Sequence, residues 1–365
     1  MALILMFWSS VSAFALTTSA ESAILINADT KEIIYEQNAH KKLPMASTTK
    51  IMTSLILAEQ PNLEKRIICT KEMVTVEGSS MGLLPGDSVS YFDLLYGMLL
   101  ASGNDAANTT AIALSGSIEN FVAAMNLKAR AMGLKSTNFV TPSGLDDEQH
   151  YSTAYDMSIL TANALKNENF KAASSSYTKT LFYGNPPYNR TLTNHNRLLK
   201  SYEGLIGVKT GFTKKSGRCL VTAAERDGGR IIVVTLNDRN DWQTHKNLLD
   251  YGFSSLQSSE LSSDLDNTFL SVLNGTSDKV SLKSNPINIK MLSENITRVV
   301  KKIWLPQNVT APVKYGDTVG KVHYYLDGNL IASSEIFADL NIDAIPKKSF
   351  NERLKEKIKG ILLKI

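Results

Sequence analysis

Apolar positions recur with two different periods in the first two thirds of the chain, which predicts a mixture of helices and strands. Residues 23–36 alternate around a turn at Asp29-Thr30, the pattern of a β-hairpin. Residues 47–60 have the length of a helix and are apolar on nearly every side, so this helix should be buried at the centre of its domain. Further helices are expected over 105–115, 118–132, 154–166 and 241–251, and further strands over 205–210, 218–224 and 230–236.

The order of these segments indicates a fold class. Strands near both ends surround a helical middle, which is typical of an α+β fold with an antiparallel sheet covered by helices. The turn-forming residues Asp227-Gly228-Gly229 join two of the strands into a hairpin. We expect this domain over residues 21–253.

After residue 253 the pattern changes twice. Residues 254–267 are rich in Ser, Asp and Glu and hold little to bury, so they are expected to be a linker. Short alternating runs follow over 268–345, and two of them flank Asp327-Gly328-Asn329, a strong hairpin signal. A small β-sandwich domain without a catalytic constellation is therefore predicted for 268–345.

The two ends of the chain carry patterns of export and of membrane attachment. Residues 1–20 hold no charge, an apolar run and a small-x-small site at Ala13-Phe14-Ala15, as in a secretory signal peptide without its basic start. Residues 346–365 are expected to form a basic amphipathic tail helix, because apolar residues recur at helical spacing from Phe350 and five basic minus two acidic side chains give +3. We expect an exported protein held peripherally on an anionic membrane surface, although a tail packed on its own domain would show the same pattern.

Composition narrows the function classes. A net charge of +4 over 365 residues, with no clustered basic face, gives no sign of nucleic-acid binding. The five histidines are scattered, and Cys69 and Cys219 lie far apart in the sequence, so neither a metal nor another cofactor is expected. The two cysteines could pair in an oxidising compartment, but we expect two buried free thiols.

Three short motifs occur in a fixed order and carry the candidate chemistry. Ser47-Thr48-Thr49-Lys50 opens the buried helix, Ser102-Gly103-Asn104 lies in a turn before a helix, and Lys209-Thr210-Gly211 lies on a strand. Residues i and i+3 share one face of a helix, so Ser47 and Lys50 can meet. A lysine that is buried near another cation, here Lys209, loses pKa and can accept the serine proton.

The other motif residues suit a peptide substrate. Ser102 can relay a proton to a leaving amine, and Asn104 can hydrogen-bond Lys50 or the substrate. Lys209 and Thr210 can bind a carboxylate, and Gly211 lets a substrate backbone run close to its strand. The N–H groups of Ser47 and Phe212 are candidates for an oxyanion hole.

In this order the motifs resemble those of class A β-lactamases and penicillin-binding proteins, in which an Asp stands at the middle of the second motif, where this chain has Gly103. The segments around them, with Gly144-Leu145-Asp146 and His150 to Asp156, resemble the low-molecular-mass penicillin-binding D-alanyl-D-alanine carboxypeptidases over about residues 22–253. Residues 311–317 and the hairpin after them resemble the C-terminal β-domain of that family. The resemblance implies a serine-type peptidase in which Ser47 is the nucleophile, Lys50 the base and Lys209 the substrate-binding cation. His150 matches a histidine near the site, although it could equally cap the helix that follows.

The resemblance further implies peptidoglycan stem pentapeptides as substrates, which lose their terminal D-Ala, and β-lactam antibiotics as covalent inhibitors. A β-lactamase or a non-catalytic penicillin-recognising sensor would use the same fold. A β-lactamase needs fast deacylation, and no Glu-x-x-Leu-Asn segment lies between Asn104 and Lys209. A sensor would tolerate loss of Lys50 or Ser102, and both are present. The balance between carboxypeptidase and endopeptidase action stays open, because loop shape selects the leaving group.

Overall fold

The computed structural model describes residues 17–346. The described chain divides into two compact units on either side of the Ser255–Leu256 bond. The expected signal peptide and tail helix lie largely outside the described residues. Thr18 and Ser19, however, hydrogen-bond Gln37 and Asp238 inside the first unit, and Ala20 already belongs to its sheet. Residues 18–20, which the sequence assigns to the end of the signal peptide, are thus part of the fold of the first unit.

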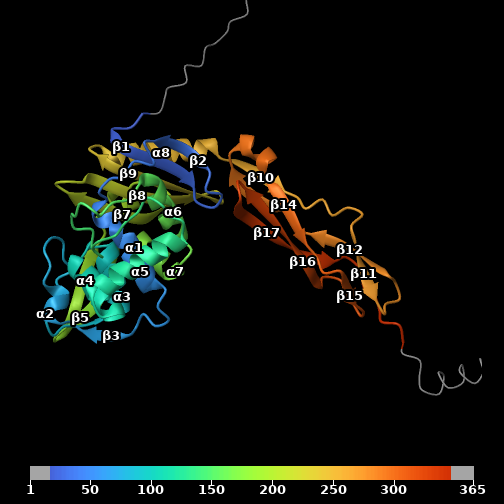
Figure 1. Cartoon of the computed structure of the whole chain (residues 1–365), viewed down its shortest axis with the longest axis horizontal. Helices are drawn as coiled ribbons and strands as arrows, with labels where there is room; N and C mark the ends of the chain where they lie inside the picture. Colours follow the sequence, from blue (N-terminus) through green and yellow to red (C-terminus); the bar gives the residue numbers. More distant parts are fainter. Residues whose placement is uncertain (1–16, 347–365) are drawn as a thin grey trace, which may run out of the picture. The chain divides into compact units, whose positions relative to one another are not determined.

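The first unit is built on an antiparallel sheet with the strand order β2-β1-β9-β8-β7. Helices pack on both of its faces, with α8 on one and α6 and α1 on the other (Figure 1). Alternation along β1 explains this: Ile24 and Ile26 join the main core, whereas Leu25 points at Gly252 of α8. The strands are β1 (Ala20–Asn27), β2 (Ile33–Gln37), β7 (Leu205–Thr213), β8 (Gly217–Arg226) and β9 (Gly229–Asp238).

Each helix expected in this unit is present, whereas α2, α3 and α7 were not expected. The helix expected over 47–60 begins as a 3-10 turn over Ala46–Thr49 and continues as α1 (Lys50–Ala58), which is buried along almost its whole length. The others are α2 (Lys71–Val74), α3 (Tyr91–Leu99), α4 (Asn104–Ser115), α5 (Ile118–Ala131), α6 (Ala154–Ala164), α7 (Glu168–Ser175), α8 (Asp241–Ser255) and the 3-10 turn Arg197–Lys200.

A second sheet, which the sequence did not reveal, lies at the end of the unit away from the central sheet (Figure 1). Its strand order is β3-β4-β5-β6, and only the hairpin of β5 and β6 is long. The bounds are β3 (Arg66–Ile68), β4 (Ser88–Ser90), β5 (Thr178–Gly184) and β6 (Pro187–Thr193).

The second unit is all-β, as expected, but the expected linker over 254–267 is wrong. Residues 254–255 end α8, and β10 (Gln257–Leu261) pairs with β13 (Ile287–Met291). Backbone hydrogen bonds hold β10 although most of its side chains are polar and not buried, so composition could not reveal it. The other sheet has the order β14-β16-β17-β12-β11-β15. Its strands are β11 (Phe269–Leu273), β12 (Lys279–Ser284), β14 (Val300–Trp304), β15 (Asn308–Thr310), β16 (Thr318–Leu326) and β17 (Asn329–Ala338).

Two general features bear on the function. Within residues 17–346, none of the helices has the length and apolar character needed to cross a membrane. Over the same residues, His, Cys, Asp and Glu side chains form no cluster of three suited to a metal ion. Cys69 and Cys219 are buried and free, as expected.

Candidate active site

The first motif brings the Ser47 hydroxyl and the Lys50 amine together at the start of α1. Lys50 Nζ lies 2.9 Å from Ser47 Oγ, 2.7 Å from Asn104 Oδ1 and 2.7 Å from the carbonyl oxygen of Ser143. The Asn104 amide is oriented by its other end, because Nδ2 donates to the Glu77 carbonyl at 2.7 Å. The oxygens of Asn104 and Ser143 can only accept, so they take the two hydrogens of a neutral amine. The lone pair of Lys50 is then left for the Ser47 hydroxyl.

Burial favours the neutral form of the Lys50 amine. Lys50 is fully buried, and this desolvation, together with the charge of Lys209, holds its pKa well below the usual value; Asp105 opposes the shift. Lys209 is also buried, and burial lowers its pKa to about 7. The second cation predicted from the sequence is therefore close enough to act on Lys50.

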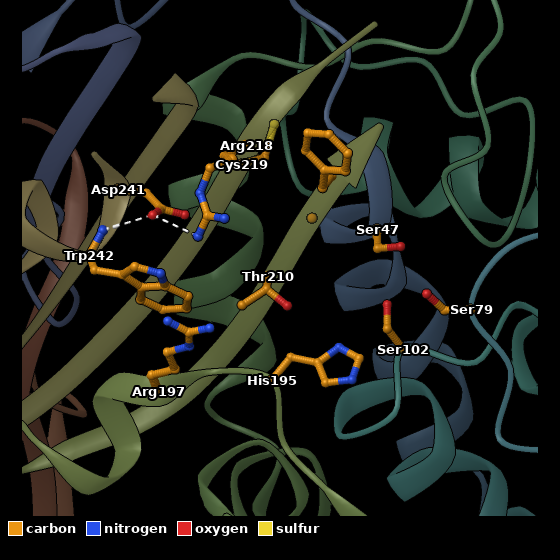
Figure 2. Close-up of a pocket in the computed structure, with 12 residues that line it drawn as sticks. Ser47, Ser79, Ser102, His195, Arg197, Thr210, Arg218, Cys219, Asp241 and Trp242 are labelled. Carbon is orange, nitrogen blue, oxygen red and sulfur yellow. Dashed lines mark hydrogen bonds and ion pairs between the residues drawn. The ribbon is translucent and has the colours of Figure 1, made fainter. Parts of the chain in front are cut away.

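The second motif lies in the short loop between α3 and α4. Ser102 adopts a positive φ of 57° although it is not glycine, a conformation that costs on the order of 1 kcal/mol and is concentrated at functional sites. Asn104 is the first residue of α4, and its N–H donates to the Ser79 carbonyl at 2.7 Å. The loop and the first turn of α4 thus fix both motif residues. Ser102 lies beside Ser47 (Figure 2), and the Asn104 side chain accepts a hydrogen bond from Lys50.

The third motif lies on β7, the edge strand of the central sheet next to the start of α1. A Cβ atom on Gly211 would lie 3.1 Å from both the Ser47 nitrogen and the Met45 carbonyl oxygen. This spacing is tighter than an ordinary Cβ contact, so glycine suits the close approach of the strand to the nucleophile. Lys209 Nζ donates to the Thr210 carbonyl at 2.9 Å. Phe212 follows, with a side chain that is 66% exposed.

His150 supports the site from beneath and does not line it. Its Nδ1 accepts from the N–H of Val140 at 2.9 Å, so Nε2 carries the hydrogen and donates to Thr49 Oγ1 at 2.7 Å. Burial lowers the pKa of His150 to about 4, which keeps it neutral. The cap of α6 is Thr153, not His150. His150 therefore ties the loop that carries Ser143 to the start of α1.

A pocket of about 320 Å³ opens over these residues (Figure 2). Ser47, Ser102, Thr210, Gly211 and Phe212 line it, whereas Lys50, Asn104 and Lys209 are buried and do not line it. The sequence did not single out the remaining lining residues, which are Ser79, His195, Arg197, Arg218, Cys219, Asp241 and Trp242.

Arg218 opens the strand expected over 218–224, and in the structure it lies directly opposite Phe212 of β7. Its guanidinium pairs with Asp241 at 2.9 Å and lies 5.5 Å from the Trp242 ring. These contacts hold a positive charge at the rim of the pocket. His195, Arg197 and Ser79 come from segments without a motif, and only the fold brings them to the pocket.

Comparison with known proteins gives two family matches. Residues 9–240 match the family described as D-alanyl-D-alanine carboxypeptidase, and residues 266–344 match the C-terminal domain of penicillin-binding protein 5. The chain is 35% identical to the D-alanyl-D-alanine carboxypeptidase DacF of Bacillus subtilis over 88% of this chain and 86% of that protein. It is 31% identical to DacC of Escherichia coli over 90% of this chain and 85% of that protein. The crystal structure of penicillin-binding protein 5 from Haemophilus influenzae superposes with a TM-score of 0.66 at 28% identity, over 90% of this chain and 98% of that one.

Proposed function

The chain belongs to the D-alanyl-D-alanine carboxypeptidase family, and from this premise we propose that Ser47, Lys50, Ser102 and Lys209 carry out its reaction. The enzyme is a serine-type, penicillin-binding carboxypeptidase that acts on peptidoglycan peptides. The observation that carries the assignment is the 2.9 Å contact between Ser47 Oγ and the fully buried Lys50 amine, whose other two neighbours can only accept hydrogen bonds.

In acylation, neutral Lys50 takes the Ser47 proton while Oγ attacks the carbonyl carbon between the last two D-Ala residues. The N–H groups of Ser47 and Phe212 would hold the oxyanion of the tetrahedral intermediate. The proton then passes from Lys50 through Ser102 to the leaving amine, the C–N bond breaks, and D-Ala departs. Water later hydrolyses the ester on Ser47 and restores the hydroxyl.

The third motif would orient the substrate. Thr210 lines the pocket and would hydrogen-bond the terminal carboxylate, while the buried Lys209 beside it would supply the attracting positive charge. The Gly211 backbone would run beside the reacting carbonyl. A β-lactam would acylate Ser47 by the same attack on its ring amide. Its leaving amine stays tethered in the opened molecule, so it remains near the ester and the adduct is expected to persist.

The experiment that tests this function measures D-Ala release from a soluble stem pentapeptide, beside a cross-linked peptide dimer and a penicillin. Fast release from the pentapeptide with slow penicillin turnover is expected. Rapid penicillin hydrolysis without D-Ala release would identify a β-lactamase, and labelling without turnover of any peptide would identify a sensor. Cleavage of the dimer in preference to the pentapeptide would identify an endopeptidase.

We further propose that the protein is exported and attached peripherally to the outer face of the cytoplasmic membrane. The uncharged apolar start with Ala13-Phe14-Ala15 supports export, and a leader ending near Ala15 would leave β1 intact. The basic amphipathic pattern from Phe350 to Ile365 supports binding to anionic lipid.

A further inference from the structure

The segment from Glu77 to Asp87 lies beside the second motif, and Asn104 donates two hydrogen bonds to it. The side chain of Asn104 donates to the Glu77 carbonyl at 2.7 Å, and its backbone N–H donates to the Ser79 carbonyl at 2.7 Å. The orientation of Asn104, and with it the acceptor offered to Lys50, therefore depends on where the 77–87 segment lies.

The buried carboxylate of Asp105, the next residue on α4, holds the middle of this segment from the inner side. It accepts from the N–H groups of Met81 at 2.9 Å, Gly82 at 3.1 Å and Leu83 at 3.0 Å, and from the Ser80 hydroxyl at 2.6 Å. Asp105 is 1% exposed, so these bonds are shielded from water. Four successive residues thus share one fixed anchor next to Asn104.

The hairpin of β5 and β6 holds the same peptide groups from the outer side. The hydroxyl of Tyr183, on β5, donates to the Met81 carbonyl at 2.7 Å. Arg190 Nη1, on β6, donates to the Gly82 carbonyl at 2.6 Å, and Nη2 lies 3.7 Å from Asp87. The guanidinium lies 4.4 Å from the centroid of the Tyr183 ring and 4.3 Å from that of the Tyr188 ring, so cation–π contacts with two rings also hold it in place.

The peptide groups of Met81 and Gly82 are therefore held by hydrogen bonds from two elements, α4 and the β5–β6 hairpin. Their N–H groups bond to Asp105 on α4, while their carbonyl groups bond to Tyr183 and Arg190 on the hairpin. A shift of the hairpin would pull on the bonds that orient Asn104. The hairpin itself contributes no residue to the pocket, so any effect on chemistry must pass through this segment.

We propose that Tyr183 and Arg190 are positioning residues, through which the β5–β6 hairpin holds Asn104, and hence Lys50, in the geometry needed for acylation. The inference rests on the proposed function, because it assigns Asn104 and Lys50 their roles in acylation. It adds a second sheet, remote from the three motifs, to the parts of the fold that set the reaction rate.

The test is a double-mutant cycle on the full chain, read by the rate constant for acylation with a labelled penicillin. Tyr183→Phe removes one hydroxyl and keeps the ring that stacks on Arg190, and Arg190→Gln removes the guanidinium. Each is combined with Asn104→Ala, and melting temperatures verify that every variant is folded at the assay temperature. Thr191→Val is the matched control, because Thr191 is exposed on β6 and its hydroxyl contacts Thr180 across the hairpin at 2.8 Å.

Tyr183→Phe and Arg190→Gln are each expected to slow acylation about tenfold or more in the wild-type background, since small misplacements of catalytic groups have effects of this size. In the Asn104→Ala background the same changes should have less than about a twofold effect, because the residue through which they act is gone. Thr191→Val should leave the rate unchanged.

Equal losses in both backgrounds would overturn the inference, because the hairpin would then act on the rate without Asn104. No loss in either background would overturn it as well and would leave the hairpin a packing role only. These outcomes leave the proposed function intact. A wild-type protein that is not acylated at all would overturn the proposed function and this inference with it.

Discussion

At the scale of single residues, the account depends on the protonation state of Lys50. A lysine amine is a base only when it is neutral, and in water this requires a pH near 10. Burial and the charge of Lys209 shift the pKa of Lys50 well below that value. The carbonyl oxygens of Asn104 and Ser143 then direct its lone pair toward Ser47.

We predict that Lys50→Ala slows acylation on the order of 10³-fold or more, because nucleophile and base act as a unit. In the wild type, the acylation rate should rise with pH as Lys50 loses its proton, and it should level off well below pH 10. Peptide binding should weaken above about pH 7, because the pKa of Lys209 is about 7 and its neutral form does not attract a carboxylate. The measurement is a pH series of penicillin acylation and peptide turnover. Near-normal acylation by Lys50→Ala would show that another group is the base.

The motifs could identify Ser47, Lys50, Ser102, Asn104 and Lys209, because their spacing follows from helix and strand geometry. They could not identify Ser143, since it contributes a backbone carbonyl, which every residue has. They also gave no sign of Ser79 or His195, which reach the pocket through tertiary packing alone. Residue type therefore led to the proposed reacting groups, whereas the groups that orient them could be found only from the fold.

At the scale of elements, long segments with a clear period were predictable. The buried helix after Ser47, the strand of the third motif and the hairpin before Ala338 all follow from local pattern. Prediction failed where backbone pairing holds a polar or short segment. β10 looked like a linker because it buries little, and β3 and β4 have three residues each. Strand pairs of this kind depend on partners far away in the sequence, and a local window holds no information on them.

These unpredicted elements bear on function through the β5–β6 hairpin. Its sequence, with two tyrosines and one arginine, gave no catalytic signal. Its hydrogen bonds to Met81 and Gly82 nevertheless connect it, through the segment 77–87, to Asn104 of the second motif. A positioning role of this kind is visible only when both partners of each bond are known.

At the scale of the whole molecule, the chain combines a peptidase unit with an all-β unit. Its sequence begins with an uncharged apolar segment and ends with a basic amphipathic one. The proposed reacting groups, Ser47, Lys50, Ser102 and Lys209, all belong to the first unit. The proposed attachment to a membrane would therefore bring the enzyme near its substrate, and the attached segment would take no part in the reaction.

We predict that deleting the residues after Lys348 releases the protein from anionic vesicles without reducing hydrolysis of a soluble peptide. The deleted part carries an apolar stripe, and its residues from Phe350 on carry a net charge of +3, five basic minus two acidic. Each basic residue near such a surface contributes about 1 kcal/mol. Vesicle co-sedimentation at low and high salt is the measurement, and salt should weaken binding only in part because it screens charge and not apolar contact. If the intact protein stayed in solution at low salt, the attachment proposal would be wrong.

The central claim, that Ser47 is the nucleophile, is tested most directly by mapping the site of a covalent penicillin adduct. The wild-type protein is incubated with a penicillin and digested, and the modified peptide is sequenced by mass spectrometry. The account predicts one adduct, an ester on Ser47 in the peptide that also contains or adjoins Lys50, and no adduct in Ser47→Ala. An adduct on Ser102 or on any other residue, or labelling that persists in Ser47→Ala, would contradict it.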